Sequence, residues 1–124
     1  MATIVELNSH RMLAVADGDP VLATVSDFAG LLGDAMGEDV RMVAIPAGRL
    51  ADDFFRLRTG LAGEVLQKFV NYGFKLAIIG DVSRWVEESN AFRDLLIELE
   101  RGTDVYAVPD FESLEARLAS APAR

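Results

Sequence analysis

The sequence predicts an α/β fold in which a mostly parallel, five-stranded sheet is flanked by about four helices, in the order β-β-α-β-α-β-α-β-α. Two observations predict it. Short apolar runs alternate with stretches whose apolar residues recur every three or four positions, which is the helical period. Glycine, proline and small polar residues separate these segments, as they do at turns and helix ends. Such alternation is typical of parallel strands joined by right-handed crossovers.

The N-terminal half is expected to form a hairpin, a helix and a buried strand. Apolar runs at residues 3–7 and 12–16 flank a polar turn and predict the hairpin. The first helix begins at Thr24, which starts a sequence similar to a capping box, and ends at Gly37. The expected apolar stripe of this helix is Val25, Phe28, Leu32 and Met36. The run at 40–45 is almost continuously apolar, as in a strand covered on both faces.

The C-terminal half continues the alternation. A second helix is expected from Thr59 onward, with the stripe Leu61, Val65, Leu66, Phe69 and Tyr72 and with Gly73 just past its end. A strand follows at 74–79. A third helix is expected between a cap at Ser89 or Asn90 and Gly102, then a strand at 104–108 and a closing helix after Pro109 and Asp110.

Length and composition predict a single domain, residues 1–120, with a frayed tail at 121–124. A chain of 124 residues, 51% of them hydrophobic, can form one core. The absence of cysteine excludes disulfides, thiolate nucleophiles and sulfur-ligated metals. No signal-peptide pattern and no bilayer-spanning apolar run is present, so we expect a soluble cytoplasmic protein without membrane contact. The net charge of −8 and the scattered basic residues disfavour nucleic acid as a partner.

The element order and its punctuation resemble the STAS domain, named from sulphate transporters and anti-sigma-factor antagonists. The residues that carry the resemblance are Asp17-Gly18-Asp19 after the second strand, the segment 40–60, and 111–116 in the closing helix. The block 58–72, followed by 76–81, is similar to an uncharacterised bacterial domain-of-unknown-function (DUF) family, which brings no assigned activity.

The STAS resemblance implies a regulatory domain that binds other proteins and is switched by phosphorylation of a Ser or Thr at a helix start. Thr59-Gly60 matches that position in this sequence. STAS antagonists typically carry an aspartate just upstream, whereas Leu57 and Arg58 occupy that stretch here.

The start of the second helix is the first candidate site. Thr59 is interpreted as the N-cap, because Thr is a preferred residue there. The alternatives are a phosphoacceptor or part of an anion site, to which free backbone N–H groups and the Arg58 guanidinium would contribute. Gly60 and Gly63 are interpreted as positions where another backbone approaches closely, with a ligand contact as the alternative.

One face of the same helix is the second candidate site. Glu64, Gln67, Lys68 and Asn71 lie at i, i+3, i+4 and i+7, opposite the apolar stripe. A solvated face accounts for them. A partner-binding surface is the alternative, and it fits the amide-rich composition.

The remaining candidates are Asp81, Trp85, His10 and the pair Asp52-Asp53. Asp81 follows a strand at the edge where open α/β sheets bind ligands, but it equally fits a turn or helix start. Trp85 either covers the sheet edge or is an exposed anchor for a partner. His10 is interpreted as a turn residue, and Asp52-Asp53 as the start of a short helical turn rather than as paired carboxylates.

The sequence thus favours a non-enzymatic regulatory or interaction domain that binds another protein, or itself as a homodimer, through the surface around the second helix. It predicts no catalytic residues, no metal and no cofactor. The alternative is a binding domain or enzyme for an anionic small molecule or nucleotide, with a pocket at Arg58-Thr59-Gly60 and Asp81.

Overall fold

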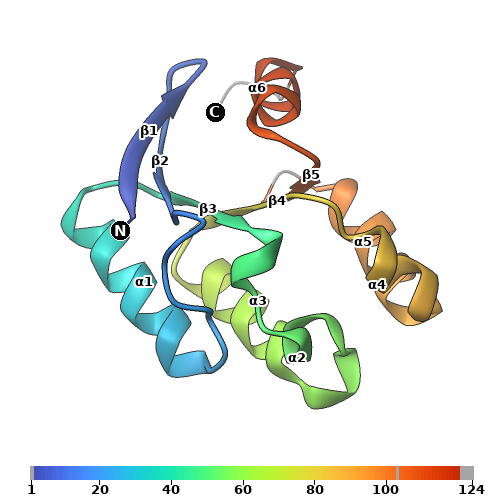
Figure 1. Ribbon diagram of the computed structural model, residues 1–124. Coiled ribbons are helices and arrows are strands. Elements are labelled where there is room, and N and C mark those ends of the chain that lie inside the picture. The colour runs from blue at the N-terminus through green and yellow to red at the C-terminus, as the bar shows by residue number, and fades with distance from the viewer. Residues whose placement is uncertain (1, 103, 121–124) are drawn as a thin grey trace.

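The computed structural model describes residues 2–102 and 104–120 (Figure 1). The tail at 121–124, which was expected to fray, lies outside the described residues. The five strands are β1 (Thr3–Leu7), β2 (His10–Ala14), β3 (Met42–Pro46), β4 (Lys75–Ile79) and β5 (Val105–Val108). They form one sheet in the order β1-β2-β3-β4-β5.

The sheet is mixed, which corrects the prediction of a mostly parallel one. β1 runs antiparallel to β2, whereas β2, β3, β4 and β5 run parallel to one another. The hairpin turns on Asn8 and Ser9, whose φ angles are 49° and 68°. Positive φ at both central residues is typical of the two-residue turns that match strand twist. His10 therefore begins β2 instead of lying in the turn, and its Nδ1 lies 3.0 Å from the Asn8 carbonyl oxygen.

Six helices occur in the described residues, together with two 3-10 turns, instead of about four helices. The helices are α1 (Val25–Gly37), α2 (Asp52–Phe55), α3 (Leu61–Asn71), α4 (Ser83–Glu88), α5 (Asn90–Glu100) and α6 (Phe111–Ser120). The 3-10 turns are η1 (Ala47–Arg49) and η2 (Leu57–Thr59). α2 confirms the interpretation of Asp52-Asp53 as the start of a helical turn. α4 was not predicted, because six residues are too few to display a helical period.

Local capping follows the sequence closely. Thr24 Oγ1 accepts a hydrogen bond of 3.2 Å from the Asp27 N–H, and the Asp27 carboxylate accepts one of 3.1 Å from the Thr24 N–H, so the capping box is confirmed. Ser89 caps α5, since its hydroxyl accepts from the Phe92 N–H at 3.1 Å. Gly73 follows α3 with φ of 73°, the left-handed conformation expected there.

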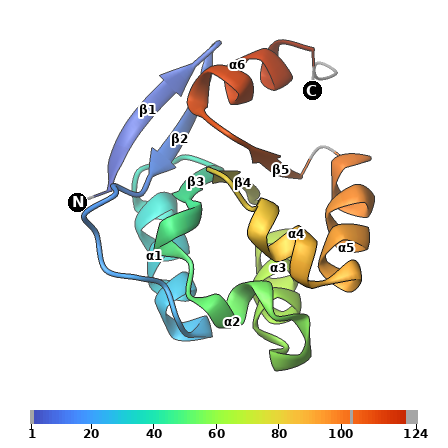
Figure 2. The ribbon, with the colours of Figure 1, turned by 45° about the vertical axis from the view of Figure 1, so that its right-hand side comes forward.

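Helices lie on both faces of the sheet (Figure 2), and each face has its own hydrophobic core. α1, α2, α3, α4 and α5 contribute to the core on one face, where the strand residues include Val43, Ile45 and Leu76. α6 covers the other face and inserts Leu114 and Leu118. The last residue of each of two predicted apolar stripes is exposed instead of buried: Met36 by 43% and Tyr72 by 51%. None of the described helices is both long and apolar enough to cross a bilayer.

Candidate functional site

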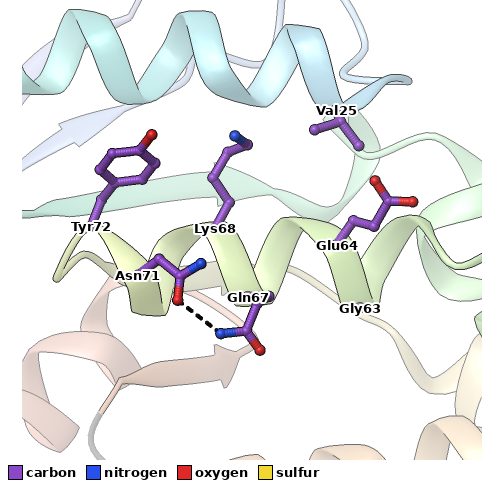
Figure 3. A pocket seen from close by; sticks show the side chains of 7 residues that line it. All are labelled: Val25, Gly63, Glu64, Gln67, Lys68, Asn71 and Tyr72. Atoms are coloured by element: carbon purple, nitrogen blue, oxygen red, sulfur yellow. Dashed lines mark hydrogen bonds between the residues drawn. The ribbon is translucent and has the colours of Figure 1, made fainter.

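A shallow groove of about 580 Å³ runs along α3 and reaches the start of α1 (Figure 3). Its lining residues are Val25, Gly63, Glu64, Gln67, Lys68, Asn71 and Tyr72. We call this surface the α3 groove. It contains all four residues of the polar face that the sequence singled out on this helix. The structure therefore brings these four side chains together at one concave surface.

The side chains of the α3 groove form two rows (Figure 3). Glu64, Lys68 and Tyr72 point toward α1, and the Lys68 Nζ lies 5.6 Å from the centre of the Tyr72 ring, a cation–π distance. Gln67 and Asn71 form the second row, in which the Gln67 Nε2 donates a 2.9 Å hydrogen bond to the Asn71 Oδ1. The Gln67 carbonyl oxygen and the Asn71 amide nitrogen take no part in this bond.

The α3 groove is suited to recognition because its polar groups are accessible and two of them are joined by a hydrogen bond. Glu64, Gln67 and Asn71 are exposed, and Lys68 is half-buried. The surface offers a carboxylate, an ammonium group and two amides, with Tyr72 supplying an exposed aromatic face. Tyrosine is enriched in protein interfaces because it combines a large apolar area with one polar group.

Thr59 does not cap α3, which corrects the interpretation made from the sequence. Gly60 occupies the N-cap position instead, and the Thr59 hydroxyl lies beside two backbone carbonyls of the preceding turn. It is 2.6 Å from the Asp53 oxygen and 2.9 Å from the Arg56 oxygen, and it accepts from the Leu61 N–H at 3.3 Å. The hydroxyl therefore links α2, η2 and the first turn of α3.

Neither glycine of this region is explained by the close backbone approach that was predicted. A Cβ atom added to Gly60 or to Gly63 would meet nothing within 4 Å. Gly60 has φ of 81°, which disfavours residues with a side chain, so backbone conformation accounts for it. Gly63 is helical and exposed, and no contact within the described chain requires glycine there.

Arg58 lies outside the α3 groove. It lines a second groove of about 560 Å³ between α2 and α4, with Phe55, Arg56, Leu57, Trp85, Glu88, Ser89 and Ala91. We call this surface the arginine groove. Thr59 and Gly60 do not line it, so the three residues predicted to share one pocket are divided by the structure.

Trp85 is buried, with 8% of its surface exposed, and it belongs to the main core. Its ring stacks on Phe55 with centroids 4.8 Å apart and an interplanar angle of 6°. The Arg84 guanidinium lies 4.4 Å from the ring centre and that of Arg56 lies 5.6 Å from it. The interpretation of Trp85 as an exposed anchor loses its premise, because these groups already cover the ring.

Asp81 fits the simpler of its two interpretations, a residue that shapes a helix start. Its carboxylate accepts from the Ser83 N–H at 2.9 Å, immediately before α4. Hydrogen bonds from the Ser83 side chain and backbone hold the pKa of the Asp81 carboxyl below its usual value. Asp81 lines neither groove. Within residues 2–102 and 104–120, no three His, Cys, Asp or Glu side chains lie close enough to hold a metal ion.

Sequence reasoning missed two residues of the α3 groove. Tyr72 had been placed in the apolar stripe of the helix, although its position four residues after Lys68 is the signal that puts it beside that side chain. Val25 comes from another helix, so no local pattern in the sequence could place it here.

Comparison with known proteins gives one match. Residues 7–118 match the protein-family model of DUF4180, described as a domain of unknown function. Neither the curated proteins nor the solved structures that were compared give a match.

Proposed function

This chain belongs to the DUF4180 family, and on that premise we propose that it is a regulatory protein-interaction domain, without catalysis of its own, that forms a homodimer through the α3 groove. The observation that carries the proposal is the concave, accessible polar surface of α3. The resemblance of the sequence to STAS domains supports the regulatory part of the proposal. The proposal also includes a cytoplasmic protein with no cofactor, bound to neither nucleic acid nor a membrane.

The charges of α3 are self-complementary. Glu64 and Lys68 carry opposite charges, and no ion pair joins them in the described chain. A two-fold axis that passes between them and sets α3 antiparallel to its copy places each Glu64 opposite a Lys68 of the second copy. Two-fold contacts are self-complementary in this way, and they are the commonest assembly of soluble proteins.

Shape supports the same contact. Gly63 leaves open space on the exposed side of α3, so a second helix can approach its backbone closely. Tyr72, which lines the groove and is 51% exposed, adds apolar area at the end of the helix. Burial of such area stabilises association by about 25 cal/mol per Å² before the costs of binding are subtracted.

Charge reversal tests the dimer. Glu64→Lys and Lys68→Glu each place like charges opposite one another across the two-fold axis, so each should raise the dimer Kd about tenfold in analytical ultracentrifugation. An equal mixture of the two variants should associate again, because every contact between unlike copies becomes attractive. The matched control is Asp94→Lys on the exposed surface of α5, which should leave the dimer unchanged. If mixing restores nothing, or the control weakens the dimer equally, the α3 interface is wrong.

A second candidate is an anionic small-molecule site in the arginine groove, where Arg56 and Arg58 both line the cavity beside Trp85. Guanidinium groups bind phosphate oxygens in bidentate fashion. Calorimetry with inorganic phosphate tests this candidate. Heat that disappears in Arg58→Gln supports it, and no heat at millimolar phosphate excludes it.

A further inference from the structure

β1 leaves one backbone edge of the sheet open. It pairs only with β2, and no other strand adjoins it in the part of the chain that the structure describes. The pairing is regular, from Thr3 with Ala14 to Leu7 with His10, without a bulge. The strand sequence contains no proline and no lysine. Proline, lysine and bulges are among the devices that block the addition of another strand to natural edges, and β1 has none of these three; its one charged residue is Glu6.

A groove adjoins this edge and gives room for side chains. It has a volume of about 680 Å³ and is lined by residues at the start of β1 and in the C-terminal turns of α1. Its lining residues are Ala2, Thr3, Ile4, Leu13, Gly33, Asp34, Gly37 and Glu38. Cβ atoms added to Gly33 or Gly37 would meet nothing within 4 Å. Gly33 lies in the interior of α1, where glycine costs about 0.5–1 kcal/mol relative to alanine, so the protein maintains open space there against a local preference.

The edge is negatively charged. Its acidic residues are Glu6 in β1 and the groove-lining Asp34 and Glu38 of the C-terminal part of α1. Asp34 and Glu38 are exposed, and their carboxylates have no hydrogen bond or ion pair within the described residues. Like charges at i and i+4 destabilise a helix, so a bound cation would relieve their repulsion.

We propose that the β1 edge binds an extended, positively charged segment of another protein, which adds to the sheet as a further strand. Alternate residues of β1 face opposite sides of the sheet. Ile4 contributes to the core on the α1 side, and Val5 and Leu7 contribute to the core that α6 covers. A matching segment therefore alternates basic residues, directed toward Asp34 and Glu38, with apolar residues directed toward Val5 and Leu7. This site is separate from the α3 groove.

A second copy of this chain fits the edge poorly. Pairing β1 with β1 would bring Glu6, Asp34 and Glu38 of two copies together, and like charges across an interface oppose association. A cationic segment gains the attraction that a second copy lacks, and backbone hydrogen bonds supply affinity in this mode of recognition.

A synthetic peptide tests the inference. The probe is a capped peptide of about seven residues that alternates valine with lysine. Added to the ¹⁵N-labelled protein at low salt, it should shift the amide signals of residues 2–7 and 33–38 in a saturable way. A peptide with a central proline should bind at least about tenfold more weakly because it cannot complete the ladder. A peptide with glutamate in place of lysine should not bind.

Paired charge removals on the protein complete the test. Asp34→Asn with Glu38→Gln should raise the Kd of the lysine peptide about threefold to tenfold. Asp94→Asn with Glu98→Gln removes the same charge at the same spacing on α5, so it should change the Kd by less than about twofold. Equal effects of the two pairs, shifts centred on α3, or no shift at β1 with millimolar lysine peptide would each overturn the proposal.

Discussion

Replacing Gly60 or Gly63 by alanine should change the stability of the protein in opposite directions. At Gly63 the backbone is helical and an added Cβ has no neighbour within 4 Å, so Gly63→Ala removes backbone entropy from the unfolded chain without a clash. Because Gly63 lies in the first turn of α3, we expect Gly63→Ala to raise the free energy of unfolding by about 0.5 kcal/mol, which is the lower part of the range for helical glycines. If another backbone packed closely against Gly63, Gly63→Ala would instead lower the free energy of unfolding.

At Gly60 the φ of 81° decides whether alanine raises or lowers the free energy of unfolding. A side chain in the left-handed region costs about 1–2 kcal/mol, and the loss of unfolded-state entropy returns about 0.4–1 kcal/mol. At the midpoints of these two ranges, Gly60→Ala should lower the free energy of unfolding by about 0.8 kcal/mol. Gly60→Asn is the matched control, and it should lower the free energy of unfolding by less than Gly60→Ala does, because asparagine tolerates this conformation better than alanine.

Urea denaturation followed by the fluorescence of the single tryptophan, Trp85, measures both changes at one protein concentration. The m-value should stay constant, so that a shifted midpoint reports stability alone. The reasoning is refuted if Gly63→Ala is less stable than wild type, or if Gly60→Ala is as stable as wild type.

Three further perturbations test local contacts. Gly80→Ala should lower the free energy of unfolding by about 2–4 kcal/mol in the same urea assay, because Gly80 has φ of 135° and its Cβ would lie 3.1 Å from the Ala47 Cβ; a neutral result would contradict the close approach. Thr59→Val should lower the free energy of unfolding by about 0.5–1.5 kcal/mol in thermal denaturation. Thr59→Asp should be no more stable than Thr59→Val, because a carboxylate cannot donate to the carbonyls that the hydroxyl contacts. Thr59→Ser keeps the hydroxyl and should retain most of the stability. Hydrogen bonds from the Ala23 and Thr24 N–H groups hold the pKa of the Asp27 carboxyl below its usual value. The stabilisation by Asp27 is therefore present above about pH 4 and is lost as the pH falls through the folded-state pKa. Stability should fall less steeply with acid in Asp27→Ala than in wild type, and identical pH profiles would refute this role of Asp27.

Features that depend on neighbouring residues in the chain could be predicted from the sequence. The capping box at Thr24, the cap at Ser89 and the terminal Gly73 follow from short-range hydrogen bonding and backbone preference, and the structure contains all three. The grouping of the polar residues of α3 followed from helical periodicity alone, because residues of one helix keep their relative positions in any fold.

Features that depend on distant contacts could not be predicted in this way. Trp85 is buried because α2 places Phe55 against its ring, about thirty residues away in the sequence. Thr59 was assigned as a cap because its neighbours allow one, but the carbonyls of α2 and η2 engage its hydroxyl. The mixed sheet arises because one hairpin returns β1 antiparallel to β2, while every later connection contains a helix.

The molar mass of the wild-type protein in solution tests the proposed homodimer most directly. Light scattering from micromolar to millimolar concentration should show a mass that rises from 13.5 kDa toward twice that value. The rise should shift to higher concentration for Lys68→Glu and should be unchanged for Asp94→Lys. A wild-type mass of 13.5 kDa at every concentration would contradict self-association through the α3 groove.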